Sequence, residues 1–144
     1  MTGSHISLTK LSAGVILAAM RAAANLQEPT FLILAALAGG DLHGYGIIKE
    51  VETLSDTRLH LSPGTLYGAL DRLKNDGLVE VTGEERVEGR LRRYYHLTDS
   101  GASALQQEID RQERVTHMAR EKLQKRAAQP RPVQPQPVRP AEVS

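Results

Sequence analysis

Apolar residues recur through the middle of the chain in stretches that differ in their spacing. Residues 31–38 are apolar on every side, start after Glu28-Pro29-Thr30 and stop at Gly39-Gly40, which predicts a short buried helix. Four apolar residues between positions 47 and 54 then recur at the spacing of one helix face. This second pattern predicts another helix, which begins near His43.

A strong helix start and two alternating stretches follow. Ser62-Pro63 combines a capping hydroxyl with proline at the first helical position, so we predict a third helix over residues 62–76. Residues 78–82 and 91–98 alternate between apolar and polar side chains and predict two strands, joined by a polar loop over residues 83–89. The hairpin follows the third helix directly, so its loop should project beside that helix.

The order of these elements indicates the fold class. Three short helices followed by a hairpin are typical of a winged helix-turn-helix, a mainly α fold with a small β-hairpin, here over residues 28–98. Thr98-Asp99 then starts a last helix of about 25–28 residues, over residues 99–126. A heptad-like seam diluted with polar residues favours packing of this helix against a second copy, with a solvated overhanging helix as the alternative. The seam consists of Leu105, Ile109, Gln112, Thr116, Ala119 and Leu123.

The two ends of the chain differ from the middle in composition. Residues 127–144 hold five of the seven prolines and little that could pack, so we expect a disordered tail. At the other end, residues 1–27 form an extension with an apolar run that is too short to span a bilayer. Two alternatives stay open for it: a helix lying against the domain, or a segment upstream of a true start at Met20.

The third predicted helix divides into an apolar stripe and an opposite face that could meet a ligand. Two glycines lie on that opposite face, each about 1 kcal/mol less favourable than alanine in a helix. Close approach of another surface, such as a groove wall of duplex DNA, would explain them; an ordinary solvated face is the alternative. The opposite face and its polar flanks comprise Gly64, Gly68, Asp71, Asn75, Thr65, Arg72, Tyr67 and Lys74.

Charge is distributed unevenly, although the chain as a whole carries a net charge of only +1. Residues 28–99 hold eight basic residues against twelve acidic ones, net −4. Within this acidic body, Arg86, Arg90, Arg92 and Arg93 lie close together with one acid among them, Glu88. The pattern predicts a local cationic finger at the hairpin that can reach backbone phosphates or a minor groove, while a solvated hairpin tip is the alternative.

Composition excludes several kinds of site. The chain has no cysteine and no tryptophan, and aromatic residues make up 3%, so disulfides, cysteine nucleophiles, cysteine-containing zinc sites and aromatic stacking platforms are excluded. The five histidines show no ligand spacing, no acid–base pair stands out, and the glycine-rich segment 39–46 lacks the lysine of a phosphate loop. We therefore expect neither an enzyme nor a metal site nor a cofactor.

Several motifs in this order resemble the PadR family of bacterial transcriptional regulators, over roughly residues 28–126. The matching segments are His43-Gly44-Tyr45-Gly46-Ile47-Ile48, Leu61-Ser62-Pro63-Gly64-Thr65-Leu66-Tyr67, Ala69-Leu70 with Arg72-Leu73, Gly77-Leu78-Val79, and Arg92-Arg93-Tyr94-Tyr95 with Leu97-Thr98. The absence of a large second C-terminal domain resembles the shorter subfamily, in which one long helix mediates dimerisation.

The resemblance implies a homodimer that binds a palindromic operator and is released by a small-molecule effector. It places Thr65, Tyr67 and Arg72 at the DNA, Tyr45 at a phosphate, and Arg92-Arg93 in the wing. Gly68 and Asp71 stand where family members often have larger or basic residues. Some short members sandwich planar drugs between tryptophans, and that mode cannot operate in this chain because it has no tryptophan.

Together these observations predict a sequence-specific transcriptional regulator, a repressor that acts in the cytoplasm at the nucleoid and involves no membrane. The alternatives are a winged-helix module for protein interaction and a sequence-tolerant architectural DNA-binding protein. Residues 62–76 should enter the major groove and residues 83–93 should form the wing. The predicted DNA-binding residues are Tyr45, Ser62, Gly64, Thr65, Tyr67, Gly68, Arg72, Lys74, Arg90, Arg92 and Arg93.

Overall fold

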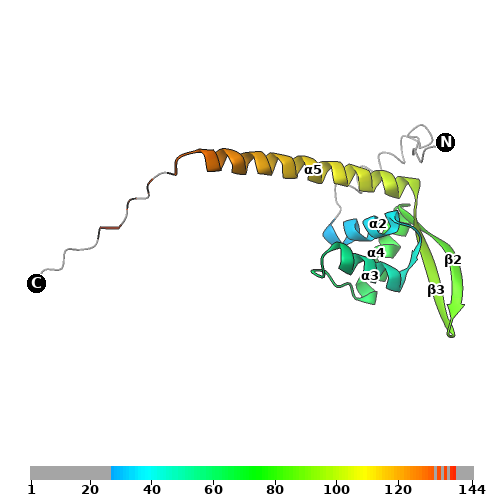
Figure 1. Cartoon of the computed structure of the whole chain (residues 1–144). Coiled ribbons are helices and arrows are strands. Elements are labelled where there is room, and N and C mark those ends of the chain that lie inside the picture. The colour runs from blue at the N-terminus through cyan, green and yellow to red at the C-terminus, as the bar shows by residue number, and fades with distance from the viewer. Residues whose placement is uncertain (1–26, 132, 134, 136, 139–144) are drawn as a thin grey trace, which may run out of the picture. The chain divides into compact units, whose positions relative to one another are not determined.

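The computed structural model describes residues 27–131, 133, 135, 137 and 138, and Figure 1 shows the whole chain. The N-terminal extension and its two alternatives, including a start at Met20, lie outside the described residues apart from Gln27. The chain divides into two compact units, the first ending at Arg111 and the second beginning at Gln112. Among the described residues, the first unit holds every strand, every helix before the last one, and the beginning of the last helix.

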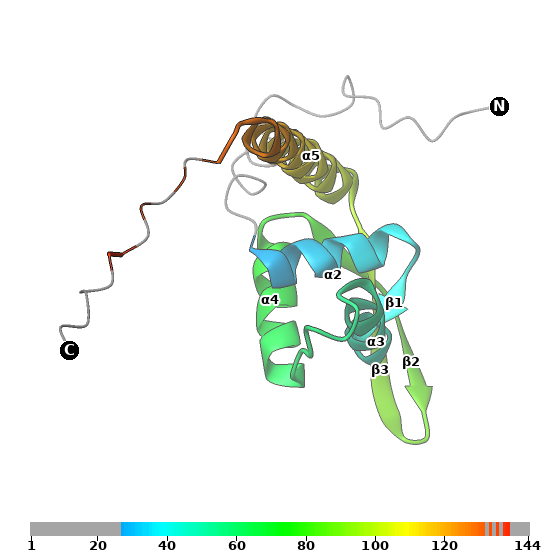
Figure 2. The same ribbon diagram turned by 60° about the vertical axis from the view of Figure 1, so that its left-hand side comes forward.

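The first unit is a winged helix-turn-helix, as the sequence predicts. Its helices are α2 (Glu28–Ala38), α3 (Gly44–Leu54), α4 (Pro63–Asn75) and the start of α5 (Asp99–Ala128). Its strands are β1 (Leu42–His43), β2 (Val79–Val87) and β3 (Arg90–Leu97), which form one antiparallel sheet in the order β1-β3-β2. Figure 2 shows α2 lying across α3 and α4, with β1 beside the base of the hairpin.

Side-chain caps fix where α3 and α4 begin. The Nδ1 atom of His43 accepts a hydrogen bond from the Gly46 amide at 3.1 Å. The Ser62 hydroxyl accepts one from the Thr65 amide at 3.2 Å, and Pro63 follows at the first helical position. Each cap satisfies an amide that a helix start otherwise leaves without a partner, and the predicted starts of both helices are confirmed.

One apolar core holds the helices and the sheet of the first unit together. The apolar stripe of α4 is buried as predicted, and so is the apolar middle of α2. The face of β3 that carries Tyr95 turns inward, with Tyr95 itself 5% exposed. The largest fully buried apolar side chains are Ile33, Leu34, Ile47, Leu66, Leu70, Leu78, Val51 and Val79.

The prediction of a loop over residues 83–89 is wrong, because most of that segment is paired strand. β2 continues to Val87 and the turn consists of two residues, Glu88 and Gly89, with φ of 51° and 78°. Two consecutive residues with positive φ are typical of a type I′ hairpin turn. The part of the hairpin beyond Thr82, residues 83–93, is called the arm here. Because the arm buries neither face, it carries polar side chains without alternation, and its sequence resembles that of a loop.

A short strand before α3 also departs from the prediction of a simple helix stop and restart. Leu42 pairs with Tyr95 and His43 pairs with Tyr94 of β3. Two residues are too few to show alternation, so the sequence gives no signal for this strand. Its pairing ties the start of α3 to the base of the hairpin.

The last helix starts where the sequence predicts and ends at Ala128, two residues beyond the predicted end. The Thr98 hydroxyl accepts a hydrogen bond from the Gly101 amide at 3.0 Å and donates one to the Gly77 carbonyl at 2.7 Å. Of the predicted tail over residues 127–144, the first two residues are therefore helical. The described residues beyond the helix are exposed and lie in neither helix nor strand.

Candidate nucleic-acid interface

The outer face of α4 is bare of side chains at its two glycines. A Cβ atom on Gly64 would meet nothing within 4 Å, and one on Gly68 would meet only an Arg72 guanidinium nitrogen at 3.8 Å. Neither glycine is therefore required by packing within the described part of the chain. Because a glycine in a helix lowers stability relative to alanine, a surface that must approach the helix backbone closely is the physical reason that remains.

Tyr67 leans from the edge of this bare face toward α3. Its side chain is 46% exposed, and its hydroxyl lies so close to Gly44 that a Cβ atom there would overlap it. Gly44 thus makes room for Tyr67 at the start of α3. The tyrosine holds the two helices of the helix-turn-helix at a fixed spacing while half of its surface stays open.

The other predicted residues of α4 lie on its exposed surface. The Ser62 hydroxyl donates a hydrogen bond to the Thr65 hydroxyl at 2.9 Å, so the cap and the first turn share one network. Arg72 and Lys74 lie in the last turn, where cations favour the helix dipole. Neither forms an ion pair with another residue in the described part of the chain, so both charges are open to a ligand.

The hairpin arm is less cationic than its sequence suggests. Across the two strands, Glu84 lies opposite Arg93 and Glu85 lies opposite Arg92. The Nε atom of Arg93 donates a hydrogen bond to the Glu84 carboxylate at 3.1 Å. The prediction of a cationic finger is thus corrected. Along the sequence, Glu88 is the one acid among residues 86–93, whereas strand pairing also places Glu84 and Glu85 beside the arginines.

Three other arginines of the arm remain without an ion pair to any described residue: Arg86, Arg90 and Arg92. All three are exposed. In Figures 1 and 2 the turn end of the hairpin lies away from the helices of the first unit. Arg90 and Arg92 are therefore exposed with no ion pair to a described residue, whereas Arg93 is paired with Glu84.

Tyr95 joins α4 to the hairpin beneath the exposed surface. Burial is the main cause that raises the pKa of the Tyr95 phenol above its usual value of 10.0, and the charges of Tyr67 and Asp71 raise it further. The positive charge of Arg93 acts in the opposite direction and lowers this pKa. Residues from α4 and β3 therefore converge where the helix meets the arm.

Tyr45 projects from the first turn of α3 and is 64% exposed. Its ring stacks on His43 with 6.5 Å between ring centroids, and the Lys49 ammonium lies 5.5 Å from the Tyr45 centroid. The His43 and Tyr94 rings also form a T-shaped pair, with 5.5 Å between their centroids. The sequence prediction includes Tyr45 but omits His43 and Lys49; the i, i+4 spacing of Tyr45 and Lys49 was the available signal.

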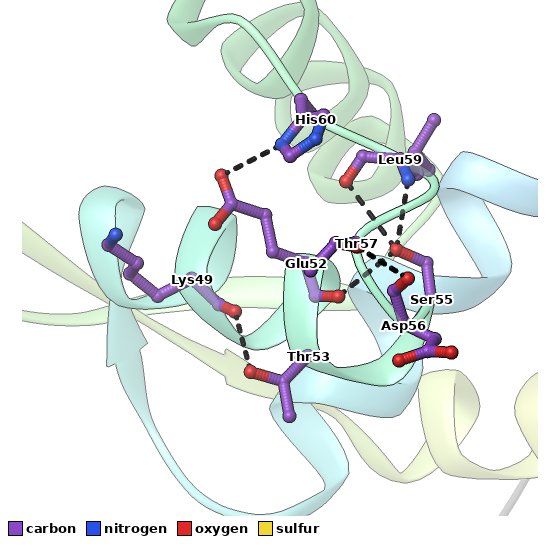
Figure 3. Close-up of polar contacts among 8 residues, drawn as sticks. All are labelled: Lys49, Glu52, Thr53, Ser55, Asp56, Thr57, Leu59 and His60. Carbon is purple, nitrogen blue, oxygen red and sulfur yellow. Dashed lines mark hydrogen bonds and ion pairs between the residues drawn. The ribbon is translucent and has the colours of Figure 1, made fainter.

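The connection between α3 and α4 is held by a serine that sequence reasoning missed (Figure 3). Ser55 is 4% exposed; its hydroxyl accepts a hydrogen bond from the Leu59 amide at 3.0 Å and donates one to the Glu52 carbonyl at 3.2 Å. His60 approaches the Glu52 carboxylate at 3.2 Å. These contacts close the loop and fix the position from which α4 starts.

The described residues contain neither a metal-type cluster nor a membrane-spanning helix. Within them, no three His, Cys, Asp or Glu side chains cluster as a metal site would require. None of the helices in this part of the chain is both long and apolar enough to cross a lipid bilayer.

The predicted dimerisation seam divides between the two units. Leu105 is 6% exposed in the core of the first unit, and Ile109 packs against that core. In the second unit, by contrast, Thr116, Ala119 and Leu123 are exposed, as is Gln112. Only the later part of the seam is therefore fully exposed.

The chain is similar in sequence to known transcriptional regulators. Residues 33–107 match the transcriptional regulator PadR-like family. A transcriptional regulator of Mycobacterium tuberculosis is 42% identical over 73 residues, which cover 51% of this chain and 64% of that protein. The chain spans 24%, 64% and 41% of the length of the first three curated relatives it matches.

Solved structures show the same fold. The crystal structure of a PadR family transcription regulator from Clostridium difficile is 25% identical, with a TM-score of 0.57, and the match covers 67% of this chain and 99% of that one. Bacillus subtilis PadR in complex with operator DNA is 24% identical, with a TM-score of 0.50, covering 56% of this chain and 46% of that one. The latter likeness concerns the fold alone.

Proposed function

The chain belongs to the PadR-like family of transcriptional regulators, and from this premise we propose that it binds operator DNA sequence-specifically as a homodimer. Members of the family are transcriptional regulators rather than enzymes. The regulator would act in the cytoplasm at the nucleoid, as a repressor that a small-molecule effector releases. No cofactor enters this proposal.

The observation that carries the proposal is the exposed face of α4. Its backbone is bare at Gly64 and Gly68, and hydrogen-bonding side chains flank it. A major groove about 12 Å wide admits one helix, and close entry brings the flanking groups to base edges. Thr65 and Arg72 on one flank are the candidates for base contacts, with Tyr67 and Lys74 on the other.

Contacts to the DNA backbone would come from both sides of α4. Arg90 and Arg92 on the arm are exposed and have no ion pair with another described residue, so they can bind phosphates. On α3, the exposed hydroxyl of Tyr45 and the nearby ammonium of Lys49 offer a second phosphate contact. These positions on either side of the helix would fix its register in the groove.

The decisive experiment is selection of bound sequences from a random duplex pool. We expect enrichment of a palindrome whose half-sites are centred about 34–36 Å apart, one turn of the duplex. Binding without an enriched motif would favour a sequence-tolerant architectural protein. Absence of binding to any duplex at low salt would reject the proposal and favour a protein-interaction module.

Within this proposal, the roles of arm and helix can be separated by their salt dependence. Replacing both Arg90 and Arg92 by alanine should weaken binding to all duplexes and lower the slope of log affinity against log salt by roughly 2 per subunit. Thr65→Ala or Arg72→Ala should instead narrow the affinity gap between operator and random DNA, because those side chains flank the bare face.

Titration of labelled duplexes at several salt concentrations measures both effects. The matched control replaces Arg114 and Lys125 by alanine, which removes the same charge from exposed positions on α5. The reverse pattern, in which the arm variant loses discrimination but keeps its salt slope, would contradict the assigned roles.

A further inference from the structure

The ion pair on the hairpin arm bears on how tightly this protein binds DNA of any sequence. We propose that Glu84 withholds Arg93 from DNA phosphates and thereby limits binding to random DNA. This inference rests on the proposed function, because it concerns the same DNA-binding surface. It assigns Arg93 a positioning role on the arm in place of the phosphate contact that the sequence predicts.

The geometry of the pair favours this role. Arg93 Nε lies 3.1 Å from a Glu84 oxygen, and the two residues are direct partners across β2 and β3. The Arg93 guanidinium is therefore held on the arm by Glu84.

A phosphate would have to compete with Glu84 for the same group. Carboxylate and phosphate both match the planar fork of a guanidinium. If a phosphate displaced the carboxylate, Glu84 would be left as an unpaired negative charge beside the negatively charged DNA. The Glu84 and Arg93 side chains are 48% and 55% exposed, so solvent weakens the pair and it restrains binding without abolishing it.

The neighbouring pair on the arm provides an internal comparison. Glu85 lies opposite Arg92 in the same ladder, but no ion pair joins them in the described structure. Arg92 is therefore open to phosphate, whereas a phosphate has to displace Glu84 before it can bind Arg93. The two arginines are adjacent in sequence yet differ in the freedom of their charge.

Restraint of one arginine matters most for random DNA. Binding to random DNA depends on phosphate contacts, whereas binding to the operator also depends on contacts to bases. A complex that is free to shift along the duplex can always bring a phosphate to a released arginine. In the operator complex, α4 fixes the register of the protein on the DNA. Release of Arg93 therefore adds at most the same phosphate contact to that complex. Discrimination should therefore fall when Glu84 is neutralised.

The test is a double-mutant cycle with Glu84→Gln and Arg93→Gln in the full-length protein. Glu84→Gln should raise affinity for a random duplex roughly three- to tenfold at 0.1 M salt, and steepen the salt slope by about 0.9 per subunit. Arg93→Gln alone should leave the slope unchanged, and in its presence Glu84→Gln should no longer steepen it. Arg92→Gln, by contrast, should lower the slope by about 0.9 per subunit.

Further variants separate the ion pair from charge and from folding. Glu113→Gln removes one acid from an exposed position on α5 and controls for net charge. Exchange of the two residues, Glu84→Arg with Arg93→Glu, restores an ion pair and should keep the wild-type slope. Thermal unfolding of each variant checks that the arm and domain remain folded; if Glu84→Gln alone unfolds, the exchanged pair and Arg93→Gln still decide the question.

Three results would overturn the inference. The first is a lower salt slope for Arg93→Gln, equal to that of Arg92→Gln, which would mean that Arg93 already contacts phosphate. The second is a gain from Glu84→Gln that persists alongside Arg93→Gln, or that Glu113→Gln reproduces. The third is no gain from a folded Glu84→Gln variant. Failure of the wild-type protein to bind any duplex would instead reject the proposed function.

Discussion

At the scale of single residues, the glycines of this chain serve opposite purposes. Gly101 lies where α5 packs against Leu78, just before β2, and Leu97, at the end of β3; a Cβ atom there would overlap the Leu78 carbonyl oxygen and approach Leu97 at 2.7 Å. Gly68 lies on the open face of α4, where a Cβ atom meets only an Arg72 nitrogen at 3.8 Å. Packing requires a glycine at position 101, whereas no packing contact among the described residues requires one at position 68.

The two positions predict opposite effects of the same substitution on the free energy of unfolding. Gly101→Ala should lower it by roughly 1–3 kcal/mol, because a backbone carbonyl cannot move aside easily. Gly68→Ala should raise it by about 0.5–1 kcal/mol, since alanine is the better helix former. Chemical denaturation measures both values, and equal effects at the two positions would contradict this account.

The loop before α4 contains a residue under backbone strain. Thr57 has φ of 62°, a left-handed conformation that is unfavourable for a β-branched side chain. Thr57→Gly should therefore raise the free energy of unfolding by about 1 kcal/mol. Thr53→Gly, the matched change within α3, should lower it by about a few tenths of a kcal/mol. Urea denaturation distinguishes the signs; a loss of stability at Thr57 would show that its side chain stabilises the loop.

At the scale of secondary-structure elements, the hairpin has a buried base and an open arm. Tyr95 lies at the base on β3, beneath α4, whereas the arm beyond Thr82 bears exposed charges. The Thr82 hydroxyl donates a hydrogen bond to Asp41 at 3.1 Å, and His96 approaches the same carboxylate at 3.4 Å. These contacts anchor the point at which the arm leaves the core.

The raised pKa of Tyr95 predicts how the junction of α4 and β3 responds to alkali. Because the phenol ionises less readily in the folded than in the unfolded state, the free energy of unfolding should fall as the pH rises above 10.0. Tyr95→Phe should make this fall shallower. Thermal unfolding between about pH 9 and 11 measures it, with Tyr45→Phe, an exposed position, as the control; an unchanged slope in Tyr95→Phe would contradict the assignment.

At the scale of the whole molecule, α5 belongs to two units. Its first turns complete the core of the first unit, with Leu105 buried there. In the second unit, Val115, Met118 and Leu123 are each at least half exposed. A second copy of the chain would cover such a face, so we predict a dimer in solution through this part of α5.

Substitutions in the second unit test the dimer without touching the core. Replacing Ala119 and Leu123 by glutamate should shift the protein to monomer at tens of micromolar, because the new charges would lie in an apolar contact. Arg114→Glu changes the net charge equally and should leave the dimer intact. Sedimentation decides between them. A wild-type monomer at the same concentration would reject dimerisation through α5, and loss of operator affinity in the dimer-breaking variant alone would support two half-sites.

The sequence by itself determined those features that depend on residues close together in the chain. The serine-proline start of α4, the apolar stripe of the same helix and the threonine cap of α5 each lie within a few positions, so local hydrogen bonding and helical spacing suffice to predict them. The alternation of residues 91–98 predicted the strand β3 in the same way. These signals, in their order, also sufficed for the fold class.

The tertiary structure decided what depends on residues that are distant in sequence. Pairing across the hairpin places Glu84 on Arg93, packing of α4 on α3 places Tyr67 on Gly44, and core packing takes Leu105 out of the predicted seam. None of these has a local signal, because each depends on strand register or on how two elements meet. A linear window can count the charges of this surface, but only the fold determines which of them remain free to bind DNA.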